Sequence, residues 1–191
     1  MKRKEKTVNS DSWIFMLLLT TLLILIKSVN IFSFRLLDFK LSYSLFLLPI
    51  SYFLVDYIAK KYDYKKAIAA ISIASVIFVC FTVIMSYLVS NKVILNTVVG
   101  EFFSFVVSQF VNLTIYMFLL NNTKSPFILV LFNYIFCIMI YYLIYTLIYF
   151  NVLSFDNYWT NFFMTIGIQT GICILLTIVD KRIERGQKKE N

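Results

Sequence analysis

Histidine is absent from this 191-residue chain, and with it the commonest protein metal ligand and the usual general base at neutral pH. No serine or cysteine can therefore be activated by an imidazole, and the chain contains no Walker loop. A carboxylate–histidine cluster that could hold a metal is likewise excluded. We expect no catalytic activity, no metal and no cofactor.

Charged residues are also scarce, at 15% of the chain, whereas hydrophobic residues make up 60%. Ordinary soluble domains carry about 25% charged residues, so the composition excludes that class. Only two prolines and four glycines occur, which fits long helices. The continuous apolar runs also lack the alternation of a membrane β-barrel strand, so strands are not expected.

What the chain does contain is six apolar segments of about 20 residues, the length that a bilayer core of about 30 Å requires. The predicted spans are 13–34, 41–59, 67–89, 98–120, 127–150 and 160–179. No small-residue cleavage site follows the first run, which is also too long for a signal peptide. The sequence predicts an all-α polytopic membrane protein, a single domain over residues 1–191 formed by six transmembrane helices.

Lysine and arginine residues predict the orientation of these spans. With the N-terminus inside, the inner segments hold 14 of these residues and the outer loops hold three. Both termini are therefore predicted to be cytoplasmic, with the bundle in the inner (cytoplasmic) membrane. The net charge of +8 then serves topology and contact with anionic lipid, and no nucleic-acid partner is expected.

One carboxylate, Asp56, ends an apolar stretch and precedes a cationic cluster. A charge within a span costs about 2.5–3.5 kcal/mol on insertion scales, so it needs a partner or a function. We consider Asp56 the leading candidate for a substrate or proton site, and a local ion pair with Lys60 at i+4 is the alternative. Glu101 could simply complement the N-terminus of its helix, and Lys27 could snorkel to the interface.

Buried amides provide the second group of candidates. Gln109 and Asn112 lie three residues apart and so share a helix face, and Asn133 lies in the next span. The short connection between these spans predicts that they are antiparallel neighbours. Amides in lipid either bond across helices or line a cavity that suits a planar, neutral heterocycle. A stripe of tyrosines in span five could sandwich such a ligand or simply pack: Tyr134, Tyr141, Tyr145 and Tyr149.

Residues 49–67, PISYFLVDYIAKKYDYKKA, resemble the signature of the vitamin uptake transporter family, the queuosine-precursor transporters. The positions that fit in one register without a gap are Pro49, Tyr52, Asp56, Tyr62, Tyr64, Lys65 and Ala67. Residues 100–118, with Ser108 and Gln109, are similar to the family's next signature. The resemblance implies import of a 7-deazaguanine-type queuosine precursor or a vitamin.

The chain also departs from the family pattern. Lys60 stands where an acidic residue is expected, Asp63 replaces a glycine, and Asn112 and Asn133 take the places of aspartates. A second Ser-Gln pair is not visible. The substrate-binding residues that the resemblance implies are Asp56, Gln109, Asn112 and Asn133, and we add Tyr52 to this predicted site.

We therefore expect a membrane importer for a small planar metabolite, working by alternating access without catalysis. Its expected partners are the lipid bilayer, the small-molecule substrate, and either an energising membrane partner or a second copy. The alternative is a non-catalytic membrane subunit, such as a substrate-binding component that docks to an energy-coupling partner. Such docking would use small residues, either Ala70 and Ala74 or Gly167 and Gly171.

Overall fold

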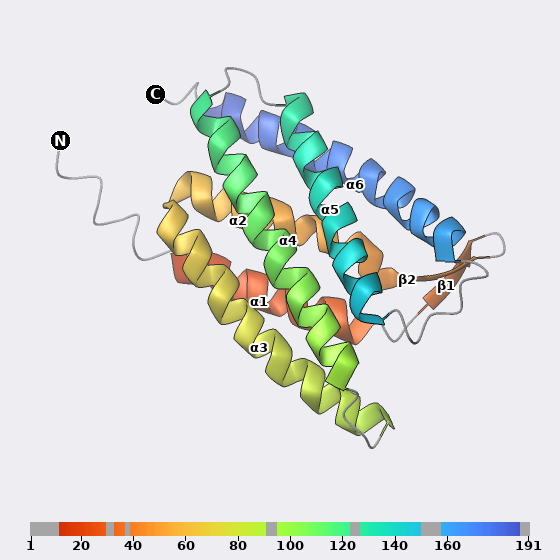
Figure 1. The fold of residues 1–191 in the computed structure, drawn as a ribbon. Helices are drawn as coiled ribbons and strands as arrows, with labels where there is room; N and C mark the ends of the chain where they lie inside the picture. Colours follow the sequence, from red (N-terminus) through yellow and green to blue (C-terminus); the bar gives the residue numbers. More distant parts are fainter. Residues whose placement is uncertain are drawn as a thin grey trace.

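The structure is a computed structural model that describes residues 12–29, 33–36, 39–90, 95–122, 127–149 and 158–187. Its described part is a helical bundle with one short hairpin (Figure 1). The elements are α1 Ser12–Val29, β1 Ser33–Leu36, β2 Phe39–Ser42, the 3₁₀ helix η1 Tyr43–Phe46, α2 Leu48–Lys61, α3 Tyr64–Ser90, α4 Leu95–Asn122, α5 Phe127–Tyr149 and α6 Tyr158–Gln187. The helical architecture expected from the sequence is confirmed.

Five of these helices are long and apolar enough to cross a membrane, namely α1, α3, α4, α5 and α6. The chain is thus built as a multi-pass membrane protein. The α6 helix extends to Gln187 and so includes much of the charged segment that follows the predicted sixth span. The number of crossings and the side on which the termini lie stay predictions.

The second predicted span, 41–59, is wrong as a single helix. Residues 39–42 instead form β2, which pairs antiparallel with β1 in the register Arg35↔Lys40. A 3₁₀ turn follows, and α2 begins at Leu48 with Pro49 in its first turn. Proline is tolerated there because its missing N–H would have no helical partner. The first predicted span, 13–34, also ends early, because α1 stops at Val29 and β1 begins at Ser33.

The broken segment nevertheless has the reach of a membrane span. At 1.5 Å per residue, the 14 residues of α2 extend about 21 Å, and the four-residue η1 adds about 8 Å. The sum is close to the thickness of a bilayer core of about 30 Å. Irregular backbone within a membrane is tolerated where protein surrounds it, and α6 packs against both η1 and α2.

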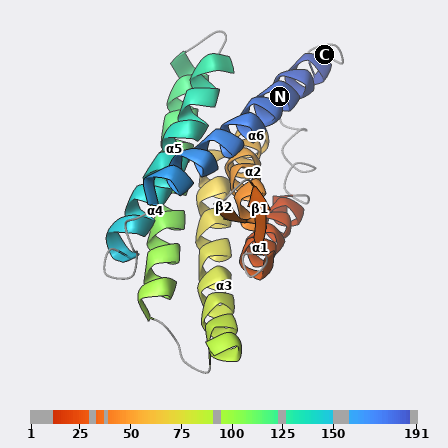
Figure 2. The same cartoon turned by 90° about the vertical axis from the view of Figure 1, so that its right-hand side faces the viewer.

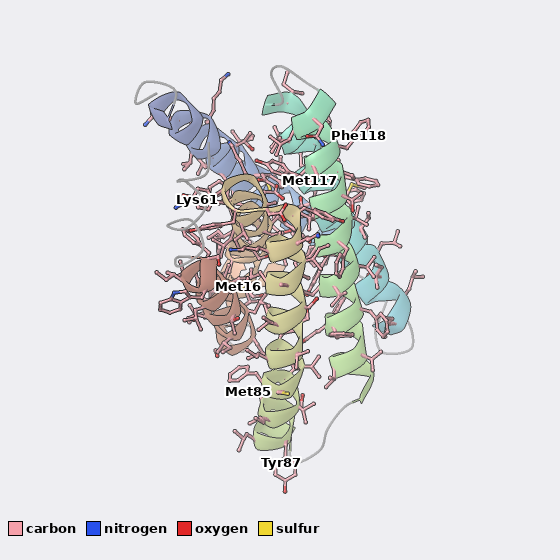
Figure 3. All side chains as sticks on the ribbon, turned by 90° about the vertical axis from the view of Figure 1, so that its left-hand side faces the viewer. Met16, Lys61, Met85, Tyr87, Met117 and Phe118 are labelled. Carbon is pink, nitrogen blue, oxygen red and sulfur yellow. The ribbon has the colours of Figure 1, made fainter. Side chains whose placement is uncertain are left out.

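Successive helices run antiparallel through the bundle. Figure 3 places Lys61, at the end of α2, and Phe118, near the end of α4, at one end of the molecule. Met85 and Tyr87 of α3 lie at the opposite end. The closest packing is between α4 and α5, which confirms that these two helices are neighbours. Figure 2 shows α6 crossing obliquely over α5 and the η1–α2 segment.

Two apolar clusters share α2. The first joins α1, α2, α3 and α4, with Leu19, Ile58 and Ile71 among its fully buried residues. The second joins α2, α4, α5 and α6 and includes Tyr52 and Ile138. Because α2 lies between the two clusters, its polar side chains are held inside the bundle.

Candidate functional site

The site is built around the short helix α2, which carries three buried polar residues. Ser51 and Tyr52 are 0% exposed and Asp56 is 2% exposed. Tyr52 and Asp56 lie four residues apart, so they share one face of the helix. Apolar residues alternate with them, among them Val55 at 0% exposure, and keep this face inside the bundle.

Asp56 begins a chain of hydrogen bonds that crosses from α2 through α4 to α5. Asn112 donates from Nδ2 to Asp56 Oδ1 at 2.7 Å. Asn133 donates from Nδ2 to Asn112 Oδ1 at 2.8 Å and to the Asn112 carbonyl at 3.2 Å. The Cys137 thiol donates to Asn133 Oδ1 at 3.4 Å. The structure therefore brings together three of the five residues predicted as a site.

This chain has a fixed direction. An ionised carboxylate can only accept hydrogen bonds, so Asn112 must turn its NH₂ group toward Asp56. Its oxygen then faces Asn133, which must donate in turn. Each amide thus donates toward α2 and accepts from the side of α5. Such a chain is expected to have one arrangement only, because reversing one amide would place two NH₂ groups or two oxygen atoms against each other.

Gln109, the fourth predicted residue, lies one turn from Asn112 on α4 and is fully buried. Its Nε2 donates to Ser51 Oγ at 2.7 Å, and Ser51 in turn donates to the Leu48 carbonyl at 2.7 Å. Within the described part of the chain, Gln109 Oε1 is buried and has no hydrogen-bond partner. An unsatisfied buried group of this kind costs about 1–3 kcal/mol.

Tyr52, the fifth predicted residue, lies in the second apolar cluster, and its hydroxyl donates to the Cys137 carbonyl at 3.4 Å. Ser51, which precedes Tyr52 on α2, accepts the hydrogen bond from Gln109 of α4. The α2 helix therefore contacts both Cys137 of α5 and Gln109 of α4. All five predicted residues belong to one buried polar region.

Gln169 of α6 belongs to the same region but was not predicted from the sequence. It is fully buried, and its Nε2 donates to the Leu45 carbonyl at 2.9 Å and to the Tyr142 hydroxyl at 3.3 Å. Its Oε1 is buried without a hydrogen-bond partner among the described residues. The signal was present, since Gln169 is an amide inside an apolar span just as Asn133 is.

A separate buried ion pair links α1 to α4. Lys27 Nζ lies 2.8 Å from both carboxylate oxygens of Glu101, and the two side chains are 13% and 6% exposed. The suggestion that Lys27 snorkels is therefore wrong, because its ammonium is held by Glu101. Glu101 is also not in the first turn of α4, which begins at Leu95. Its partner is a lysine rather than the helix N-terminus.

The tyrosine stripe of α5 does not act as one surface. Tyr134 is buried in the second apolar cluster at 1% exposure. Tyr141 and Tyr145 stack on each other, with ring centroids 6.3 Å apart and planes 5° apart. These contacts favour the packing interpretation for Tyr134. The Tyr149 side chain lies outside the described residues.

No protein-family model, curated protein or solved structure matches this chain. Among the residues that the structure describes, no group of three histidine, cysteine, aspartate or glutamate side chains could hold a metal ion. The chemistry that the site offers is therefore hydrogen bonding by amides, hydroxyls and one carboxylate, enclosed by apolar residues.

Proposed function

We propose that this chain is a multi-pass transporter of the cytoplasmic membrane that imports a small planar metabolite. The observation that carries the proposal is the buried polar region shared by α2, α4, α5 and α6. Polar side chains inside membrane proteins are costly and commonly mark substrate pathways. Here two amide oxygens, Gln109 Oε1 and Gln169 Oε1, have no hydrogen-bond partner among the described residues and so keep unused capacity.

The break between η1 and α2 supports the same proposal. Transporters often bind substrates beside discontinuous helices, where free backbone groups face the site. In this chain the Leu45 carbonyl belongs to the 3₁₀ segment and is bound by Gln169 of α6. The site thus joins the irregular segment to the long helix α6. A tilt of α6 would change the contact between Gln169 and the Leu45 carbonyl directly.

The substrate class that we propose is a queuosine precursor of the 7-deazaguanine type or a vitamin. It rests on the resemblance of residues 49–67 to the vitamin uptake transporters. The four residues implied by that resemblance lie in the buried polar region with Tyr52, although Asn112 and Asn133 replace aspartates. The asparagines keep the hydrogen-bonding role but remove two negative charges.

A thermal-shift screen of the purified protein against deazapurines, purines and vitamins tests this function. A ligand at 100 times its dissociation constant should stabilise the protein by about 2.7 kcal/mol. The shift should be lost in Gln109→Leu and kept in Thr114→Ala, a control on α4 whose hydroxyl bonds only its own helix at 2.8 Å. Uptake of the ligand into proteoliposomes should follow. A ligand that binds without uptake would contradict transport.

One observation favours the alternative, a non-transporting subunit that docks to an energy-coupling partner. A Cβ added at Gly167 or Gly171 would meet no atom within 4 Å, so this face of α6 is open. Ala70 and Ala74 are instead fully buried and serve packing within the bundle. The double variant Gly167→Leu/Gly171→Leu separates the two functions. Unchanged uptake supports an autonomous importer, and loss of uptake with intact ligand binding supports docking.

A further inference from the structure

We propose that the α2–α3 junction binds the headgroup of an anionic phospholipid through the ammonium of Lys61. The junction, residues 60–66, comprises the end of α2, a two-residue turn and the start of α3. The proposal narrows the general contact with anionic lipid, expected from the net charge, to one position. It is independent of the proposed transport function, because it concerns the surface of the bundle and not its buried polar region.

Aromatic rings hold the Lys61 side chain in place. Its Nζ lies 5.1 Å from the ring centroid of Phe15 on α1, 5.6 Å from that of Tyr57 and 5.3 Å from that of Tyr62. All three distances are within the limit of about 6 Å for a cation–π interaction. The position of this ammonium is therefore set by three rings at once.

The rings themselves are fixed by packing. The centroid of Phe15 lies 5.0 Å from that of Tyr57 and 5.7 Å from that of Tyr62. Phe15 and Tyr62 also pack against the first apolar cluster. Because α1 and α2 together position the ammonium, less side-chain entropy is lost when an anion binds to it than with a freely rotating lysine.

The rings position the Lys61 ammonium but do not cancel its charge. Among the described residues, no carboxylate forms an ion pair with Lys61, and its side chain is exposed. Lys27 is the contrast within this bundle, because both carboxylate oxygens of Glu101 bind its ammonium. The acidic residue of the junction, Asp63, accepts a hydrogen bond from the Tyr64 backbone N–H at 2.7 Å. Lys61 therefore keeps a positive charge that an external anion can meet.

The surroundings of Lys61 are also basic. The seven residues of the junction include four lysines and one aspartate. Lys66 Nζ donates to Ser12 Oγ at 3.3 Å and lies 5.7 Å from the ring centroid of Tyr62, the same ring that Lys61 contacts. Two ammonium groups thus adjoin one ring, and a phosphate bound at Lys61 is attracted by both.

The junction lies at the level where lipid headgroups are expected. The membrane-spanning lengths of α1 and α3 begin at Ser12 and Tyr64, and Lys61 is next to both ends. Trp13 is 57% exposed and Tyr64 is 36% exposed, as is typical of the aromatic belt at a membrane interface. A lipid carries its phosphate at this level, which favours a phospholipid over a soluble anion as the occupant.

Quenching of tryptophan fluorescence by brominated lipid tests the proposal. The chain has two tryptophans, so Trp159→Phe leaves Trp13, two residues from Phe15, as the reporter. The full-length protein is placed in phosphatidylcholine nanodiscs that contain an increasing minor fraction of brominated phosphatidylglycerol. The matched series contains brominated phosphatidylcholine instead. Both faces of a nanodisc have the same lipids, so the result does not depend on the orientation of the chain.

We expect brominated phosphatidylglycerol to associate about tenfold more strongly than brominated phosphatidylcholine. Lys61→Gln should lower this preference at least about fivefold, whereas Lys65→Gln, which removes the same charge from an exposed position of the junction, should lower it less than about twofold. Tyr62→Leu keeps every charge but removes one of the rings, and it should also lower the preference. The two lysine variants decide the outcome even if Tyr62→Leu does not fold.

Equal losses in Lys61→Gln and Lys65→Gln would overturn the proposal, because they would show that only the total charge acts. Equal quenching of the parent by the two brominated lipids would also overturn it. Inorganic phosphate, compared with sodium chloride at equal ionic strength, should not displace brominated phosphatidylglycerol. Displacement by phosphate would assign Lys61 to a soluble anion and contradict a lipid site.

Discussion

Two buried carboxylates of this bundle are bound by different kinds of side chain. Glu101 is bound through both oxygens by the ammonium of Lys27, so charge meets charge directly. Asp56 Oδ1 accepts a hydrogen bond from the neutral amide of Asn112, which is bound in turn by Asn133. The first arrangement is a closed pair between two helices. The second is a directed chain across three helices.

The difference suggests different roles. A buried ion pair compensates its own charges, and removal of one partner leaves the other unpaired at a large cost. In a chain of amides no single side chain has to compensate a full charge. Substituting one amide should therefore cost less stability than breaking the ion pair, and should change ligand binding more. We therefore expect the Lys27–Glu101 pair to serve the architecture of the bundle and the Asp56 chain to serve the proposed function. One experiment on the orientation of the bundle comes first, and four variants then test this assignment.

The largest expected effect is the difference in thiol labelling between the two ends of the bundle, because a cysteine either reacts from outside or does not. In a background without Cys80, Cys137 and Cys173, a single cysteine at Lys92 should react with an impermeant thiol reagent from outside. A cysteine at Lys65 should react only after the membrane is opened. Labelling of position 65 from outside would reverse the orientation predicted from the lysines and arginines.

Lys27→Met should lower the free energy of unfolding in detergent by about 3–5 kcal/mol, because Glu101 is left buried without its cation. Chemical unfolding followed by tryptophan fluorescence measures the loss. The double variant Lys27→Met/Glu101→Gln should recover most of it, and Lys65→Met, at an exposed position, is the control. A double variant as unstable as the single one would contradict a self-contained pair.

Asp56→Asn should reduce uptake of the screened ligand at least tenfold, while the protein still folds, because asparagine keeps an acceptor for Asn112. Uptake into proteoliposomes and the unfolding midpoint are measured together. Asp56→Asn with Lys60→Gln tests the competing explanation. If this double variant transports like the parent, Asp56 is only the partner of a local ion pair.

Asn133→Leu should cost about 1–3 kcal/mol, because it leaves Asn112 Oδ1 without its donor in the interior. The change also removes the bond to the Asn112 carbonyl. Thermal unfolding against the Thr114→Ala control measures the effect. A loss larger than that of Lys27→Met would show that the amide chain, and not the ion pair, dominates the stability of the bundle.

Cys137→Ala should have the smallest effect, about 1 kcal/mol or less. The thiol is a weak donor, and its contact with Asn133 Oδ1 is 3.4 Å long. The same unfolding assay applies, with ligand affinity as a second readout. A tenfold loss of ligand affinity with unchanged stability would show that Cys137 also contributes to the proposed ligand site.

Helices α3, α4 and α5 were predictable from continuous apolar runs with charged or polar ends, and their bounds differ from the prediction by a few residues. The hairpin and the short α2 were missed, because the apolar residues on either side of the charged segment 35–40 were assigned to the two flanking spans. Pro49 was the available signal, since it favours the first turn of a helix and so predicts a start near Leu48. The Lys27–Glu101 pair was also missed, because 74 positions separate its members along the chain.

The sequence by itself determined that this is a helical membrane protein with polar residues in its spans, because hydrophobicity and segment length are local properties. It also singled out Asp56, Gln109, Asn112 and Asn133, since each is an expensive residue to place in an apolar segment. Only the tertiary structure decided how they combine. Which amide faces the carboxylate, and which oxygens of Gln109 and Gln169 remain without a partner in the described chain, depends on the neighbours that packing brings from distant helices.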